Sequence, residues 1–161
     1  MRKRIKQPGP LRHVLVLAGL LCAGGAHADL PPSMQNAQRT EIKFPPAMRD
    51  HFLANMRNHL AAVSEIQAAL GDGNFELAAK TATERLGMTA QSSMACNPAM
   101  AHMGGMAQYM PDAMREAGRT MHHAADRFAV DAKARDYRAA IASLSKVTQA
   151  CVACHAQYRV R

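Results

Sequence analysis

Apolar side chains recur at spacings of three and four residues in four long segments, and this pattern restricts the fold more than any other feature. Such spacing places the apolar residues on one face of a helix. It predicts helices over about residues 46–70, 74–86, 111–134 and 136–159. Glycines at 71 and 73 end the first segment, since glycine readily adopts the left-handed conformation of a helix end. No alternating pattern predicts a strand.

Four amphipathic helices of this length must bury their apolar faces against one another. The simplest arrangement is an all-α, antiparallel four-helix bundle, with short turns joining the first helix to the second and the third to the fourth. A long connection, residues 88–110, joins the second and third helices and contains six methionines. The apolar faces are rich in alanine and methionine, which leaves room for a large flat ligand among flexible side chains.

The first 28 residues are organised as a cleaved secretory signal peptide. A basic start is followed by an apolar stretch, Val14–Ala26, and by Ala26-His27-Ala28 as the cleavage site. The stretch has 13 residues, and a membrane-spanning helix needs roughly 20. We therefore expect export to the periplasm without a stable membrane anchor. A lipoprotein signal at Cys22 is a weaker alternative, because Leu21 precedes it where a small residue is usual.

This signal divides the chain into three parts. Residues 1–28 form the leader, the proline-rich residues 29–45 form an irregular lead-in, and residues 46–161 form one helical domain. The leader contains five of the 20 basic residues, so the mature chain keeps 15 basic and 12 acidic residues, a net charge of +3. No run of basic residues remains, and nucleic-acid binding has no support.

The most informative motif is Cys151-Val152-Ala153-Cys154-His155, close to the C-terminus. C-x-x-C-H is the attachment signature of haem c. On a helix, residues i, i+3 and i+4 share one face, so two thiols three residues apart can reach two vinyl groups of one porphyrin. The motif predicts one covalent haem c, with His155 as an iron ligand.

Three other interpretations of the two cysteines compete. A thiol–disulfide oxidoreductase places its motif at the start of a helix in a βαβ context, whereas this motif lies near the end of the last helix. A zinc site needs a second Cys/His pair at a usual spacing, which the sequence lacks. Two unrelated core cysteines would leave the export signal and His155 unexplained.

The run from Cys151 to Arg159, near the end of a chain with four predicted helices, resembles the class II c-type cytochromes. These include the cytochromes c-prime and their low-spin relatives. The resemblance covers about residues 46–161, with a sharp motif only in the nine residues of that run. It implies a periplasmic bundle with haem beside the last helix, His155 as the proximal ligand and Arg159 near the ring on the proximal side.

The same resemblance implies that the first helix presents one residue to the other face of the haem. The matching position falls near Met56, although Phe52 stands where the family usually has Arg, which shifts the register by as much as a turn. We rank Met56 first as the sixth iron ligand, His59 second and Met48 third. Each also has an ordinary explanation as a packed core residue. His51, His122 and His123 are expected on solvated helix surfaces.

Two further features stay open. The segment Met100–Met106 contains three of the methionines and His102, and thioethers suit Cu(I), but packing around the bundle end explains them more simply. Cys96 is the odd cysteine of an exported chain. It is either a free thiol or part of a disulfide between two chains, which would make a homodimer.

These features predict a non-enzymatic electron carrier that exchanges electrons with redox partner proteins. The main alternative is a five-coordinate haem protein that binds or senses a small gas, such as nitric oxide or carbon monoxide. A third hypothesis is metal handling by the Met-rich segment. No acid/base pair or activated nucleophile supports catalysis.

Overall fold

Four main helices pack against one another in the computed structural model, which describes residues 39–97 and 105–161. They are α2 (Pro46–Gly71), α3 (Phe75–Arg85), α4 (Asp112–Lys133) and α5 (Tyr137–Gln157). Each lies within two residues of its predicted bounds. The predicted signal peptide, most of the lead-in and residues 98–104 of the connection lie outside the described residues.

Local sequence signals explain where these helices begin and end. Pro46 occupies the first turn of α2, where its missing N–H costs nothing. Asn74 and Asp136 cap α3 and α5, because their side-chain oxygens accept hydrogen bonds from Leu77 N at 3.1 Å and Ala139 N at 2.9 Å. Gly73, with φ of +69°, lets the chain reverse between α2 and α3. Both helix pairs are therefore joined by tight turns.

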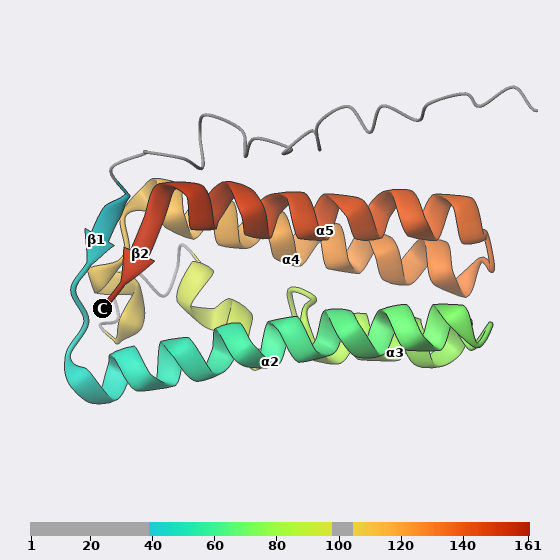
Figure 1. Cartoon of the computed structure of the whole chain (residues 1–161), viewed down its shortest axis with the longest axis horizontal. Coiled ribbons are helices and arrows are strands. Elements are labelled where there is room, and N and C mark those ends of the chain that lie inside the picture. Colours follow the sequence, from blue (N-terminus) through green and yellow to red (C-terminus); the bar gives the residue numbers. More distant parts are fainter. Residues whose placement is uncertain (1–38, 98–104) are drawn as a thin grey trace, which may run out of the picture.

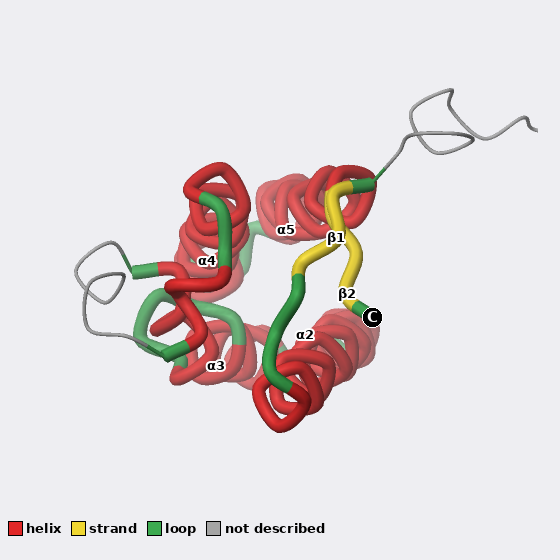
Figure 2. Tube along the Cα trace, turned by 90° about the vertical axis from the view of Figure 1, so that its left-hand side faces the viewer, coloured by secondary structure: helices red, strands yellow, loops and turns green. Residues whose placement is uncertain are grey.

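The helices are arranged in the cyclic order α2, α3, α4, α5, which Figure 2 shows end-on. α2 packs against α3, α3 against α4 and α4 against α5, whereas α2 and α5 approach each other closely at very few positions. In Figure 1 the two pairs lie as separate layers, with α4 and α5 above α2 and α3. Of the neighbouring pairs, the least closely packed one thus includes α5, the helix that carries the cysteine motif.

The connection and both ends of the domain contain structure that the sequence pattern does not predict. Two 3₁₀-helices, η1 (Gln91–Cys96) and η3 (Met106–Tyr109), lie in the connection between α3 and α4. Strand β1 (Thr40–Ile42) lies in the segment expected to be irregular, and it pairs in parallel with β2 (Tyr158–Val160). The fourth helix consequently ends at Gln157, two residues before its predicted end.

Buried apolar residues form two clusters. The larger one, here the central cluster, is rich in alanine and involves all four helices; its buried members are Ala62, Val63, Ile66, Ala69, Leu70, Ala78, Ala79, Ala82, Leu86, Met121, Ala125, Phe128, Ala129, Ala132, Ala140, Leu144 and Val147. The smaller one, here the end cluster, is buried beneath the β1–β2 ribbon and the connection; its buried members are Ile42, Phe44, Cys96, Met110 and Met114. Close alanine contacts draw the helices together in the central cluster, whereas sulfur-containing and aromatic side chains fill the end cluster.

A membrane-spanning helix must be both long and strongly apolar. Across residues 39–97 and 105–161, no helix combines the length and the hydropathy that such a segment requires.

Candidate cofactor site

Cys151 and Cys154 lie on the last two turns of α5, where both side chains are half-buried and both thiols are free. Cys151 packs against the central cluster, and Cys154 packs against the end cluster. Burial raises the pKa of both thiols, and the neighbouring Cys151 raises that of Cys154 further. The two thiols therefore stay protonated at neutral pH and span the boundary between the clusters.

The boundary between the central cluster and the end cluster also crosses α2 and α4. On α2, Phe52 packs against the end cluster and Ala62 belongs to the central cluster, with Met56 and His59 between them. On α4, Gly118 lies between Met114 of the end cluster and Met121 of the central cluster. We call Met56, His59, Gly118, Cys151 and Cys154 the junction layer. Sequence reasoning placed four of these five residues in or beside one site, and each lies along its own helix where one cluster gives way to the other.

His155 lies one position beyond Cys154 and four beyond Cys151, on the same side of α5. Its side chain is exposed. An exposed imidazole on a well-formed helix can bind a metal ion without disturbing the core. The predicted set Cys151, Cys154 and His155 is thus presented by one rigid helix.

Arg159 follows the motif in β2 and is half-buried. Its Nη2 atom forms an ion pair with Glu41 Oε2 at 3.2 Å, which links β2 to β1. Its Nε atom is buried without a hydrogen-bond partner. The guanidinium is therefore tied to the ribbon through Nη2, while its Nε–H remains an unused donor.

The three ranked sixth-ligand residues lie in different surroundings. Met48 packs against the end cluster, and Met56 is half-buried and belongs to neither cluster. His59 is only 9% exposed, and its Nε2 atom has no hydrogen-bond partner. Burial, followed by the nearby His122 and Arg85, lowers the pKa of His59 to about 4, so its imidazole is neutral.

The expectation that His122 lies on a solvated surface was wrong, whereas His51 and His123 are exposed as predicted. His122 is 1% exposed, and its Nδ1–H donates to the Leu86 carbonyl oxygen at 2.6 Å. Its ring centroid lies 5.8 Å from that of His59, with the planes almost perpendicular. A signal was available in the sequence, since His122 lies four residues after Gly118 and three before Ala125 on the predicted apolar face.

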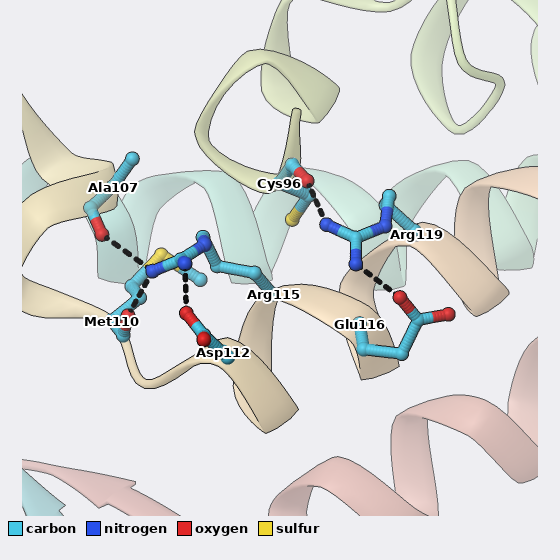
Figure 3. A network of polar contacts seen from close by, with 7 residues as sticks. All are labelled: Cys96, Ala107, Met110, Asp112, Arg115, Glu116 and Arg119. Carbon is cyan, nitrogen blue, oxygen red and sulfur yellow. Dashed lines mark hydrogen bonds and ion pairs between the residues drawn. The ribbon is translucent and has the colours of Figure 1, made fainter. Parts of the chain in front are cut away.

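A polar network fixes the connection against α4 (Figure 3). The Arg115 guanidinium donates to the carbonyl oxygens of Ala107 at 3.1 Å and Met110 at 2.5 Å, and it pairs with Asp112. Arg119 donates to the Cys96 carbonyl oxygen at 2.7 Å and pairs with Glu116. Both 3₁₀-helices are thereby held over the end cluster.

Cys96 is buried under this network, at 6% exposure. Its sulfur lies where Gly118 has no side chain, and a Cβ atom at that glycine would overlap it. Burial is the main reason that the pKa of Cys96 rises to about 11, with Arg119 acting in the opposite direction. A disulfide between two chains would require this thiol to leave the end cluster. The homodimer predicted from the odd cysteine therefore has no support from the position of Cys96 and stays a prediction.

We expect Cys96 to resist alkylation in the folded protein. At pH 8, a pKa of about 11 leaves about one thiol in a thousand ionised, and the thiolate is the reactive form. Iodoacetamide should therefore label Cys96 in denatured protein but not in native protein, as measured by mass spectrometry of the tryptic peptide. The native rate should rise only as the pH approaches 11. Equal labelling in both states at pH 8 would contradict the buried position.

Comparison with protein-family models, curated proteins and solved structures found no match for this chain. Within the described ranges, no three or more His, Cys, Asp or Glu side chains lie together as a metal site. Most of the Met-rich segment predicted as a possible copper site, Met100–Met106, lies outside those ranges. The chemistry of the site therefore depends on the junction layer and its surroundings.

Proposed function

We propose that this chain is a class II c-type cytochrome: an antiparallel four-helix bundle that holds one covalent haem c and transfers electrons between redox partner proteins in the periplasm. The resemblance of the C-terminal motif gives the class. The order of the four helices, their tight turns and the long connection between the second and third helices support the same architecture.

One observation carries the proposal. Two buried side-chain nitrogens in the described residues lack a hydrogen-bond partner, His59 Nε2 and Arg159 Nε. Both belong to residues that the sequence predicted beside a haem. A buried polar atom without a partner costs about 1–3 kcal/mol. A bound haem would satisfy both atoms. Its iron could bind His59 Nε2, and one of its carboxylates could accept a hydrogen bond from Arg159 Nε.

The junction layer also suits a flat group. It separates two packed clusters, and it includes residues of α2 and α5, which are neighbours in the cyclic order but approach each other closely at very few positions. Covalent attachment at Cys151 and Cys154 would hold a flat group between the clusters, because one thiol faces each of them.

The residues of the motif have distinct roles in this proposal. Cys151 and Cys154 would hold the haem through thioether bonds, each formed by addition of S–H across one vinyl double bond with the hydrogen going to the neighbouring carbon. This addition needs no oxidant or reductant. The raised pKa values of Cys151 and Cys154 keep both groups in the thiol form before the addition. His155 would supply a nitrogen ligand to the iron from the same helix.

The bound haem would supply a one-electron couple at its iron. The chain's own contribution is to exclude water and to fix the ligands. The central cluster closes one side of the layer, and the end cluster closes the other under the β1–β2 ribbon. The ion pair between Arg159 and Glu41 ties that ribbon to the segment directly after the motif.

The absorption spectrum of the mature exported protein, oxidised and then reduced, tests this function. We expect a Soret band, a sharp and split pair of bands at longer wavelength on reduction, and no change when carbon monoxide is added. A single broad reduced band that responds to carbon monoxide would favour gas binding instead. Absence of a Soret band would remove the haem from the proposal altogether.

A further inference from the structure

His59 Nε2 is one of two buried side-chain nitrogens without a hydrogen-bond partner in the described part of the chain, and of the two it is the one that can bind a metal ion. The side chain is nine-tenths buried, and the atom has neither a hydrogen-bond partner nor access to water. With the proton on Nδ1, a neutral imidazole in this position keeps a lone pair on Nε2 that nothing in the described residues satisfies. Retaining such a group in the core has a free-energy cost, so a bound partner is the simplest reason for its presence.

The position of His59 indicates what that partner is. His59 belongs to the junction layer, as Cys151 and Cys154 of α5 do, and it lies along α2 between the residues of the two clusters. Met56 lies one turn earlier on α2 and is only half-buried, outside both clusters. Of these two residues, His59 has its ligand atom in the water-free interior.

A second histidine fixes the ring of His59. The two rings meet edge to face at 5.8 Å between centroids, on α2 and α4. His122 itself cannot turn freely, because its Nδ1–H donates to the Leu86 carbonyl oxygen of the α3 C-terminus at 2.6 Å. This chain of contacts from α3 through α4 to α2 limits the orientations available to the His59 imidazole.

We propose that His59, rather than Met56, is the sixth ligand of the haem iron, and that His122 is the residue that positions it. This proposal rests on the proposed function, since it needs the haem. It specifies the kind of site, which is a bis-histidine iron with one ligand from the motif helix and one from α2. Bis-histidine ligation gives a lower reduction potential than histidine–methionine ligation.

Two matched alanine variants separate the candidates, and covalent haem is first verified by haem staining on a denaturing gel. We expect His59→Ala to convert the low-spin spectrum to high-spin and to let the reduced protein bind carbon monoxide. Met56→Ala, one turn away on the same helix, should keep the low-spin spectrum, and its reduced form should not bind carbon monoxide. The reverse pattern, or no change in either variant, would overturn the assignment. Loss of staining in the unmutated protein would instead overturn the proposed function.

His59→Met covers the case in which the alanine variant does not fold. Methionine preserves most of the side-chain volume and offers a thioether. We expect this variant to remain low-spin and to have a higher reduction potential than the unmutated protein, because sulfur favours the reduced iron. An unchanged potential would show that residue 59 does not touch the iron.

The positioning role of His122 has its own test. His122→Asn keeps a side-chain donor for the Leu86 carbonyl, whereas His122→Leu removes the donor at similar volume. We expect the leucine variant to show a mixture of high- and low-spin haem, and the asparagine variant to recover most of the low-spin signal. If the two variants have identical spectra and potentials, His122 fills space only and does not position His59.

Discussion

Replacing both Cys151 and Cys154 with alanine is expected to abolish covalent haem completely. The two thiols are the motif's only attachment points, and both lie half-buried at the boundary between the clusters. Alanine has high helix propensity, so α5 should persist. The measurement is haem staining on a denaturing gel, with the mass of the intact protein as a second readout. Staining that persists in the double variant would refute the attachment site.

Cys96→Ser is the matched control for this experiment. Cys96 lies in the end cluster with Cys154, but it belongs to η1 and not to the motif. Its removal should leave the haem stain unchanged. Each single variant, Cys151→Ala or Cys154→Ala, should retain one of the two thioether bonds. Loss of staining in Cys96→Ser would indicate that the end cluster, rather than the motif alone, is needed for attachment.

The helices were predictable because their signals are local. The apolar spacing on α2 continues along the whole helix, and Pro46, Gly73 and Asn74 mark where α2 begins and where α3 follows. The pairing of neighbouring helices then follows from short turns. The cysteine motif was likewise recognisable, because its chemistry depends on five consecutive residues.

The β1–β2 ribbon could not be predicted in the same way. Each strand has three residues, too few for an alternating pattern to stand out, and the partners lie at opposite ends of the domain. Their pairing depends on the fold that brings Thr40 beside Tyr158. The same holds for Gly118, the one member of the junction layer that sequence reasoning missed, because it lies on α4 and no motif links it to the residues on α2 and α5.

His122 illustrates a different limit of sequence reasoning. Histidine occurs both on protein surfaces and in cores where its nitrogens form hydrogen bonds. The apolar spacing on α4 placed His122 close to the buried face, but the carbonyl that accepts its hydrogen bond belongs to the end of α3. Only the packed structure reveals that partner, and with it the contact between His122 and His59.

The division into two clusters suggests separate roles for the two ends of the domain. Nine of the 17 buried members of the central cluster are alanines, which allow close packing of helix backbones. The end cluster instead contains three sulfur-containing buried residues and is closed by irregular elements. We therefore expect stability to depend mainly on the central cluster, and properties of the cofactor to depend on the junction layer and the end cluster.

Phe128→Ala should have the largest effect on stability of any single alanine substitution in the central cluster. Phe128 is the only aromatic buried member of that cluster, and its side chain is completely buried. Its small alanine neighbours cannot expand to fill the space. We expect a loss of about 3–5 kcal/mol in the free energy of unfolding, measured by urea denaturation followed by circular dichroism.

Val130→Ala supplies the control, because it lies two residues away on the same helix and is 58% exposed. Its expected effect is within about 0.5 kcal/mol. Phe128 is ten residues from Gly118 on α4, roughly 15 Å along the helix axis, so the haem spectrum of folded Phe128→Ala should match that of the unmutated protein. A destabilisation below about 1 kcal/mol would mean that the helices close over the missing ring. A changed spectrum would mean instead that the central cluster transmits its packing to the junction layer, and that the two ends of the domain are not independent.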